Sequence, residues 1–579
     1  MADRREVPSW LNSEKRNFLT GNKMLSENSS GQPAAPWKRV DARLWGLLAI
    51  TMVSLLFQLL LSGYVGGDRT TTPDTRKYIK LATEMQDALN GVGKMNGDVT
   101  RTPGYPLLVL FAAGSARIKL SDVNLPIRNW QGTNTEGKKL VGRIILLQEI
   151  LGFAIPLIVY LIALSMGGSA LLSFLVSLCY FSDIRSVAFQ YVILTETLSV
   201  FLMLLTLLVF IGAIMRQSFG WIALCGIVTG LTVLVRPPLA VLPAILCGAA
   251  YLILRYDGAN FKRSVSWLGS YVAIAAVFPL FWSFVNLQGT GHFFFTQNAT
   301  VTLQNFAARH FVQLDIDDPE LQVLQKHARQ ELERARRLNV RDHESYAFTR
   351  SFDNVANELA LDDPMYLYSL ASRANRIAIL NFPLAFLHGG ARRCAESWSV
   401  PFNNVKNRYA IDRIAEFGVP GRLLGGYGYM LFGPATFFCL LVLTPLAAMK
   451  MPSQTRILFV SLVAFAITYT VATTLADENE PIRHTMQARI LVNGMLMAAC
   501  CIIVGKSAYW RQSLRGRKSH QTASGTCTRN PDQHLFHGRN SMHTAWKSWR
   551  HQINKKPIPS TATHDDLKIK AALQRRKPI

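Results

Sequence analysis

Apolar segments long enough to cross a lipid bilayer recur along this chain, and they constrain its fold more than any other feature. A membrane-spanning helix needs about 20 mostly apolar residues. The candidate segments lie at roughly 44–64, 140–165, 169–183, 191–215, 220–236, 238–255, 265–287, 427–448, 457–474 and 488–507. Only 17% of the 579 residues are charged, whereas a soluble protein has roughly a quarter. The sequence therefore predicts an all-α polytopic membrane protein with about 10 transmembrane helices.

Basic residues flank the predicted spans on one side of the membrane. Positively charged loops remain on the cytoplasmic side, and the polar leader 1–43 is basic. From Lys506 onward the tail holds sixteen Lys or Arg against three Asp or Glu. We therefore attribute the net charge of +25 largely to cytoplasmic flanks, not to nucleic-acid binding. On this orientation the outer segments are 65–138, 288–425 and 475–487.

The same pattern divides the chain into five parts. These are a cytoplasmic leader (1–43), an N-terminal transmembrane catalytic module with the first outer loop 65–138 (44–287), a large extracytoplasmic region (288–425), C-terminal transmembrane helices (426–507) and a basic, disordered cytoplasmic tail (508–579). Several outer segments have a helical pattern. We expect interfacial helices at 75–89 and 365–388, a charged helix at 318–337, and an interfacial or re-entrant piece at 104–114, which is too short to span.

Ionisable residues gather in the outer loops and at the outer ends of the spans. They are Asp74, Tyr78 and Arg101 in the first loop, Glu196 and Arg236 at the ends of two spans, and Arg483 and His484 in the last loop. Ionisable groups at membrane depth are costly and often functional. Cations bind phosphate, and a carboxylate can accept a proton from an attacking hydroxyl. This combination indicates a site for a phosphate-bearing substrate at the outer face.

Each of these residues also has a structural interpretation. Asp74 can cap the helix that follows it, and Tyr78 can anchor that helix at the interface. Arg101 can be a solvated loop cation. Glu196 can hold a neighbouring helix, and Arg236 can snorkel to the lipid headgroups.

Taken in order, the motifs resemble the GT-C superfamily of membrane glycosyltransferases, in its protein O-mannosyltransferase and lipid A aminoarabinose transferase branch. The matching residues are Asp74-x-x-x-Tyr78, Arg101-Thr-Pro-Gly-Tyr105-Pro106, Leu194-Thr-Glu-Thr-Leu198, Gly230-Leu231 with Arg236-Pro237, and Arg483. The family often has Arg-Tyr and a nearby proline in its late loop. This chain has Arg483-His484-Thr485-Met486 there.

The resemblance implies a polyprenyl-phosphate sugar as the donor and transfer on the extracytoplasmic face of the plasma (inner) membrane of the cell envelope. It implies a catalytic acid in the first outer loop, where Asp74 matches. We expect Asp74 and Glu196 to be catalytic, with substrate contacts from Tyr78, Arg101, Tyr105, Arg236, Arg483 and His484. The acceptor would be a lipid, a glycan or a protein, glycosylated by a single inverting displacement.

The sequence contains no Gly-rich phosphate loop, so no nucleotide-sugar site is expected. The eight cysteines show no metal-ligand spacing, so we assign no metal ligands. A divalent ion remains an option only if Asp68, Asp74 and Glu196 converge in space.

A transporter or flippase of a lipid-linked saccharide is the alternative function. Transporters usually place their binding groups near the membrane midplane, on broken helices within paired repeats. Here the ionisable groups lie at one end of the spans, and the sequence shows no repeat. A third possibility, a non-catalytic assembly factor, leaves the combination of Asp74 with Arg101 unexplained.

Overall fold

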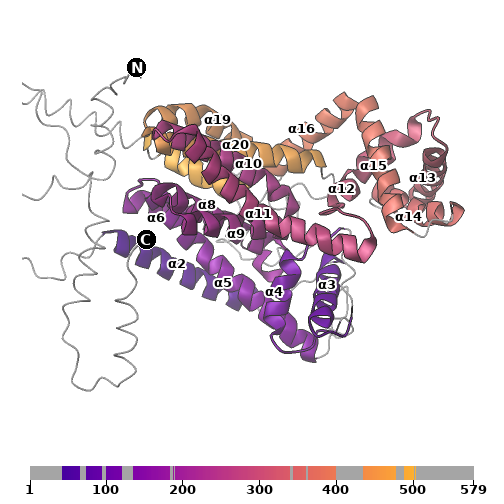
Figure 1. Cartoon of the computed structure of the whole chain (residues 1–579), viewed down its shortest axis with the longest axis horizontal. Helices are drawn as coiled ribbons and strands as arrows, with labels where there is room; N and C mark the ends of the chain where they lie inside the picture. The colour runs from indigo at the N-terminus through magenta and orange to yellow at the C-terminus, as the bar shows by residue number, and fades with distance from the viewer. Residues whose placement is uncertain are drawn as a thin grey trace, which may run out of the picture. The chain divides into compact units, whose positions relative to one another are not determined.

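The computed structural model describes residues 42–65, 73–93, 100–119, 135–182, 187, 189–339, 343–359, 363–399, 434–476, 488–500 and 502–503. The regular structure of these residues is helical, with no strand among them (Figure 1). The predicted fold class, an all-α polytopic membrane protein, is confirmed. The predicted leader and tail lie outside the described residues, apart from Ala42 and Arg43.

Among the described residues, six helical segments are long and apolar enough to cross a membrane. They are Ala42–Ser62 within α2 (Ala42–Val65), α5 (Thr135–Ser165), α8 (Glu196–Arg216), Pro237–Tyr256 formed by η4 (Pro237–Ala240) and α10 (Val241–Tyr256), α11 (Phe261–Thr290), and Ser453–Leu475 within α20 (Ser453–Ala476). The other four predicted spans are also helical where they are described, but shorter. These are α6 (Ala170–Ser182), α9 (Phe219–Val235), α19 (Pro434–Met449) and Ala488–Cys500.

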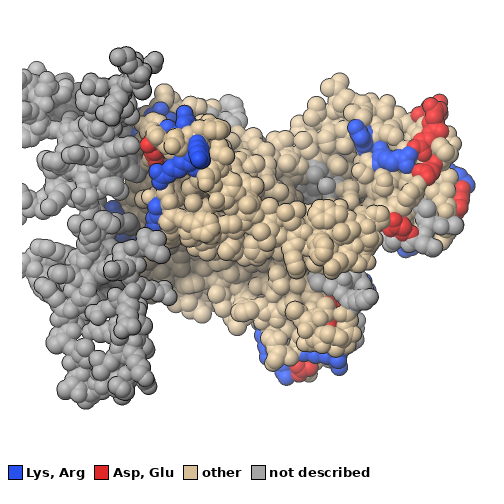
Figure 2. Space-filling model, viewed as in Figure 1, with Lys and Arg blue, Asp and Glu red and all other residues tan. Residues whose placement is uncertain are grey.

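The surface of the helical bundle fits a lipid environment. Along α2, Trp45, Met52 and Leu59 are 61%, 66% and 63% exposed. Figure 2 shows a broad face of the bundle without charged side chains, with charges gathered toward its two ends. Large exposed apolar surfaces are rare on soluble monomers, so this face is suited to contact with lipid tails.

Small residues and hydroxyl groups join the helices at the centre of the bundle. The helix α9 packs against both α8 and α11. A Cβ atom added at Gly230 would lie 2.7 Å from the carbonyl oxygen of Ala275, so the glycine permits the close approach of α9 and α11. The hydroxyls of Thr206 and Thr232 hydrogen bond at 2.9 Å between α8 and α9. These contacts fix the ends of α8 and α9, which carry two candidate site residues.

The segment predicted to be the first outer loop, 65–138, contains among its described residues two helices that pack against each other, α3 (Pro73–Leu89) and α4 (Gly104–Ala113). The predicted helix 75–89 is confirmed, and its apolar side is buried except at Leu89, which is 80% exposed. The helix α4 has 10 residues. At 1.5 Å per residue it is about 15 Å long, too short for a hydrocarbon core of about 30 Å.

The segment predicted to be the large outer region, 288–425, has a hydrophobic core of its own. Its helices are α12 (Asn298–His310), η5 (Phe311–Gln313), α13 (Pro319–Arg337), α14 (His343–Glu358), α15 (Pro364–Asn381) and α16 (Pro383–Ser399). The predicted helix 318–337 is confirmed as α13. The single amphipathic helix predicted at 365–388 is wrong. Because Pro383 stands within this stretch, α15 ends at Asn381 and α16 begins at Pro383. The helix α15 buries Leu370 and Ala374 in the core of this region.

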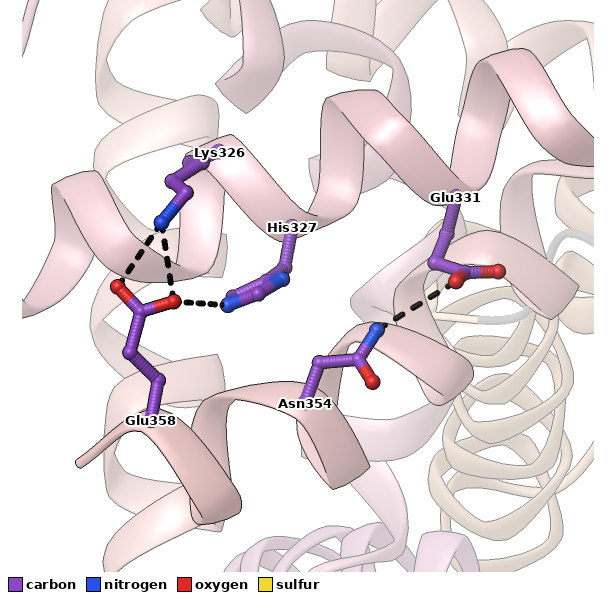
Figure 3. Close-up of polar contacts among 5 residues, drawn as sticks. All are labelled: Lys326, His327, Glu331, Asn354 and Glu358. Atoms are coloured by element: carbon purple, nitrogen blue, oxygen red, sulfur yellow. Dashed lines mark hydrogen bonds and ion pairs between the residues drawn. The ribbon is translucent and has the colours of Figure 1, made fainter. Parts of the chain in front are cut away.

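A small polar cluster joins α13 to α14 in this region (Figure 3). The carboxylate of Glu358 accepts hydrogen bonds from Lys326 Nζ at 3.0 Å and from His327 Nε2 at 2.7 Å. Further along, Asn354 Nδ2 donates to Glu331 Oε1 at 3.4 Å. The hydrogen bonds from Lys326 and then His327 hold the pKa of Glu358 below its ordinary 4.5. The ionised form of Glu358 is therefore the form that stabilises the α13–α14 contact.

We expect the variant Glu358→Gln to have a lower melting temperature than the wild type above pH 4.5, the ordinary pKa of this carboxyl. Because the folded-state pKa is depressed, the stabilisation is complete above 4.5 and is lost as the pH falls through the folded-state value. The difference should therefore vanish at lower pH. Thermal unfolding of the purified chain across this range tests it. Glu333→Gln, at an exposed position of α13, is the control and should show no such trend.

Candidate functional site

Three candidate residues of the first outer loop form one cluster. Asp74 lies in the first turn of α3, and Arg101 precedes α4. Arg101 Nη2 donates to Asp74 Oδ1, and the Arg101 guanidinium carbon lies 5.6 Å from the ring centroid of Tyr78. The side chains of Arg101 and Asp74 are 18% and 22% exposed. This ion pair is therefore partly open to solvent, where a substrate can reach it.

A second ion pair lies at the adjoining ends of α8 and α9. Glu196 is the first residue of α8, and Arg236 directly follows α9. Arg236 Nη1 lies 3.0 Å from Glu196 Oε1, and the two side chains are 5% and 0% exposed. Arg236 has an extended backbone (φ −143°, ψ 97°), as expected before Pro237. Arg236 therefore binds Glu196 inside the protein and does not snorkel to the headgroups.

Contacts between neighbouring residues place the two ion pairs in one region. Thr75, next to Asp74, donates from Oγ1 to the carbonyl oxygen of Ile193 at 3.1 Å. On the other side, Gly104 lies against the residue before Arg236: a Cβ atom at Gly104 would be 2.6 Å from the backbone N and Cα of Val235. The structure thus brings Asp74, Arg101, Glu196 and Arg236 together from four separate segments.

The close approach at Gly104 gives a testable consequence. In Gly104→Ala the new methyl group would overlap backbone atoms of Val235, so α4 or the end of α9 must move. Overpacking of this kind typically costs about 1–3 kcal/mol. We expect the variant to have a lower melting temperature and a lower activity in any assay of this site. The control is Gly269→Ala in α11, where nothing lies within 4 Å of an added Cβ, and it should unfold like the wild type.

Tyr105 occupies a different position from the one expected of a substrate contact. Its side chain is fully buried, its ring centroid lies 4.9 Å from that of Tyr78, and its hydroxyl donates to Gln148 Oε1. Burial, and then the nearby Tyr78 and Glu196, raise the pKa of the Tyr105 phenol well above its ordinary value. Tyr105 therefore remains a neutral hydrogen-bond donor that supports the site from within.

Two residues near the site were not anticipated from the sequence. Tyr469 of α20 is fully buried and interacts with both Arg236 and Glu196. Gln148 of α5 is also fully buried and accepts from Tyr105. Both lie within apolar spans, where a single tyrosine or glutamine has no sequence pattern that separates it from ordinary helix packing.

Other predicted residues are not part of this cluster as described. Arg483, His484 and Asp68 lie outside the described residues. Within the described part of the chain, no group of three or more His, Cys, Asp or Glu side chains is placed to hold a metal ion.

The arrangement has a defined chemical capacity. An accessible carboxylate can accept a proton, and its arginine partner can instead bind an anion such as a phosphate. The second pair is buried, and the low dielectric around it strengthens its field. Such a site suits a displacement in which negative charge develops on a phosphate leaving group.

No family model matches this chain, and no curated protein matches it. Two archaeal proteins are among the solved structures to which this chain is similar. One is an oligosaccharyltransferase, AglB, from Archaeoglobus fulgidus, in complex with an inhibitory peptide and a dolichol-phosphate. The likeness covers 86% of this chain and 53% of that one, at 13% identity and a TM-score of 0.45. The other is an Archaeoglobus fulgidus oligosaccharyltransferase tethered to an acceptor peptide, at 13% identity, a TM-score of 0.42, and 80% and 50% coverage. The chain spans about half the length of these proteins.

Proposed function

We propose that this chain is an integral membrane glycosyltransferase of the plasma (inner) membrane that uses a polyprenyl-phosphate sugar as its donor. The acceptor is a hydroxyl group of a lipid, glycan or protein on the extracytoplasmic face. The observation that carries the proposal is the pairing of a partly exposed Asp74–Arg101 with a buried Glu196–Arg236 in one region. This combination provides a base for the acceptor and cations for the departing phosphate.

The proposed reaction is one displacement at the anomeric carbon of the sugar. The acceptor hydroxyl binds beside Asp74, and its oxygen forms the new bond to the anomeric carbon while its proton passes to the Asp74 carboxylate. The bond between that carbon and the phosphate oxygen breaks, and the electron pair leaves with the polyprenyl phosphate. Attack from the side opposite the leaving group inverts the configuration at this carbon.

Arg101 has two partners in this mechanism. In the structure it binds Asp74. A donor phosphate competes for the same guanidinium, since arginine binds phosphate with a planar, bidentate geometry. When Arg101 turns to the phosphate, the lone pairs of Asp74 become available to the acceptor hydroxyl. Donor binding would in this way prepare the base.

The buried pair has a supporting role in the same step. Arg236 adds positive potential behind the phosphate as its charge develops, the kind of fixed electrostatic stabilisation that lowers barriers in dry sites. Glu196 is fully buried at the start of α8. We therefore assign to Glu196 the task of holding the Arg236 guanidinium, and we keep proton transfer for Asp74.

A transfer assay separates this function from the alternatives. The purified chain is placed in vesicles with a short-chain polyprenyl-phosphate sugar and candidate acceptors, and empty vesicles serve as the control. Sugar on the acceptor together with free polyprenyl phosphate supports the proposal. Movement of the intact donor between leaflets without cleavage would indicate a flippase instead, and neither result would indicate a non-catalytic role.

A further inference from the structure

A single glutamine on α5 organises the short segment, residues 189–195, that leads into α8. Gln148 is fully buried. Its Nε2 donates to the carbonyl oxygens of Phe189, Gln190 and Val192 at 3.2, 3.0 and 2.8 Å. The amide has two N–H groups, so one of them is shared between two of these three backbone carbonyls, which lie within a span of four residues.

The segment needs such a partner because of where it lies. Residues 189–195 comprise η3 (Phe189–Tyr191) and the residues that connect it to α8, and every one of them is buried. Buried backbone groups must be hydrogen bonded, and irregular backbone at membrane depth occurs only where the protein satisfies it. The segment ends at Glu196, so its position fixes where the buried ion pair lies.

A second contact locks the same segment against α5. A Cβ atom at Gly152, one turn after Gln148, would lie 2.2 Å from the side-chain amide of Gln190. Gln190 Nε2 in turn donates to the hydroxyl of Tyr180 at 2.7 Å. Residues 189–192 are therefore fixed to α5, and Gln148 supplies the polar part of that attachment.

The other atom of the same amide faces the first outer loop. Gln148 Oε1 accepts the hydrogen bond from Tyr105, whose ring contacts Tyr78, and Tyr78 lies one turn after Asp74 on α3. Gln148 therefore donates toward the Glu196 side and accepts from the Asp74 side. A primary amide can donate and accept at once, whereas a carboxylate can only accept.

We propose that Gln148 is a positioning residue that sets the Asp74–Arg101 pair relative to the Glu196–Arg236 pair. It touches no substrate and acts through Tyr105 and the 189–195 segment. This inference rests on the proposed function, because it explains how the two halves of that site are held at a fixed separation. It also accounts for an amide at this position within an apolar span.

The variant Gln148→Glu tests the proposal through its pH profile. A protonated glutamic acid can donate to one carbonyl and accept from Tyr105, whereas the ionised form cannot donate at all. Burial raises the pKa of such a carboxyl. We expect kcat of the variant to fall as the pH rises through that pKa, on the order of 100-fold, with little change in the donor KM. The wild type should lack this fall.

Two further variants separate the role of Gln148 from a general effect of charge on α5. Glu149→Gln, which alters the charge at the next, half-buried position of α5, is the control and should keep the wild-type kcat and pH profile. Tyr105→Phe removes only the hydroxyl that donates to Gln148. It should lower kcat by roughly tenfold, as loss of one hydrogen bond would, and should add little to the effect of Gln148→Glu at high pH.

Hydrogen exchange of the amides in 189–195 provides a result that does not depend on turnover. Gln148→Glu should exchange faster than the wild type in this segment at high pH. If the variant exchanges faster but the wild-type protein transfers no sugar, the role of Gln148 in holding the segment is kept and the proposed function is overturned. Wild-type exchange together with a wild-type pH profile would overturn the assignment.

Discussion

Asp74→Asn should abolish sugar transfer while the protein still inserts into the membrane and folds. Asparagine has the size of aspartate and can still accept a hydrogen bond from Arg101, but it cannot take a proton from the acceptor. General bases contribute about 10²–10⁴-fold to rates, so we expect kcat to fall by about 10³-fold or more. The measurement is the rate of product formation by the purified variant, with its elution profile and melting temperature recorded beside it.

The same helix offers a matched control. Asp87 also lies on α3 and also pairs with an arginine, since Arg117 Nη2 lies 3.4 Å from Asp87 Oδ1. This pair is not part of the cluster around Asp74. Asp87→Asn should therefore leave kcat within about twofold of the wild type, as surface ion pairs contribute about 0–1 kcal/mol. Normal turnover in Asp74→Asn would remove Asp74 from the mechanism.

Removing one partner of the buried pair should have the largest effect on stability. Arg236→Met leaves Glu196 as an uncompensated buried carboxylate, and breaking such a pair costs about 3–5 kcal/mol. Glu196→Gln should be destabilising in the same way. The double variant, Glu196→Gln with Arg236→Met, removes both charges and should regain much of the lost stability. Melting temperatures of the four proteins form a double-mutant cycle that measures this coupling.

Activity in the same four proteins separates structure from function. The double variant should have a low kcat even though its stability is regained. Loss of one charge-stabilising donor raises the barrier by about 2.7–4 kcal/mol, which lowers kcat by about 10²–10³-fold. Arg263→Met, at the exposed start of α11, is the control and should keep wild-type stability and rate. A stable and fully active double variant would show that Arg236 only joins the helices.

The hydrophobic pattern predicted the helices of this chain well, because span length and apolar periodicity are local properties. The helix that carries Asp74 was predicted from apolar residues at helical spacing. The apolar run that forms α4 was predicted not to cross the membrane because it has too few residues. The helix predicted at 365–388 failed because Pro383 stands within it, a local signal that outweighs amphipathic spacing. The interface position predicted for this segment stays a prediction.

The sequence identified most of the clustered residues but not how they pair. Glu196 and Arg236 lie 40 positions apart. They meet because α8 and α9 pack side by side, so that the end of α9 returns to the start of α8. That step follows from helix lengths once the spans are known. The contacts of Gln148 and Tyr469 do not follow, since they depend on how α5 and α20 rotate about their axes. Such rotations are set by packing across the whole bundle.

A structure with polyprenyl phosphate bound tests the central claim most directly, that the two ion pairs form one site for a lipid phosphate at the outer face. We predict that the phosphate binds the Arg101 guanidinium, near Arg236, with the Arg101–Asp74 hydrogen bond broken. A phosphate bound at the membrane midplane, or at a place remote from both arginines, would contradict the account.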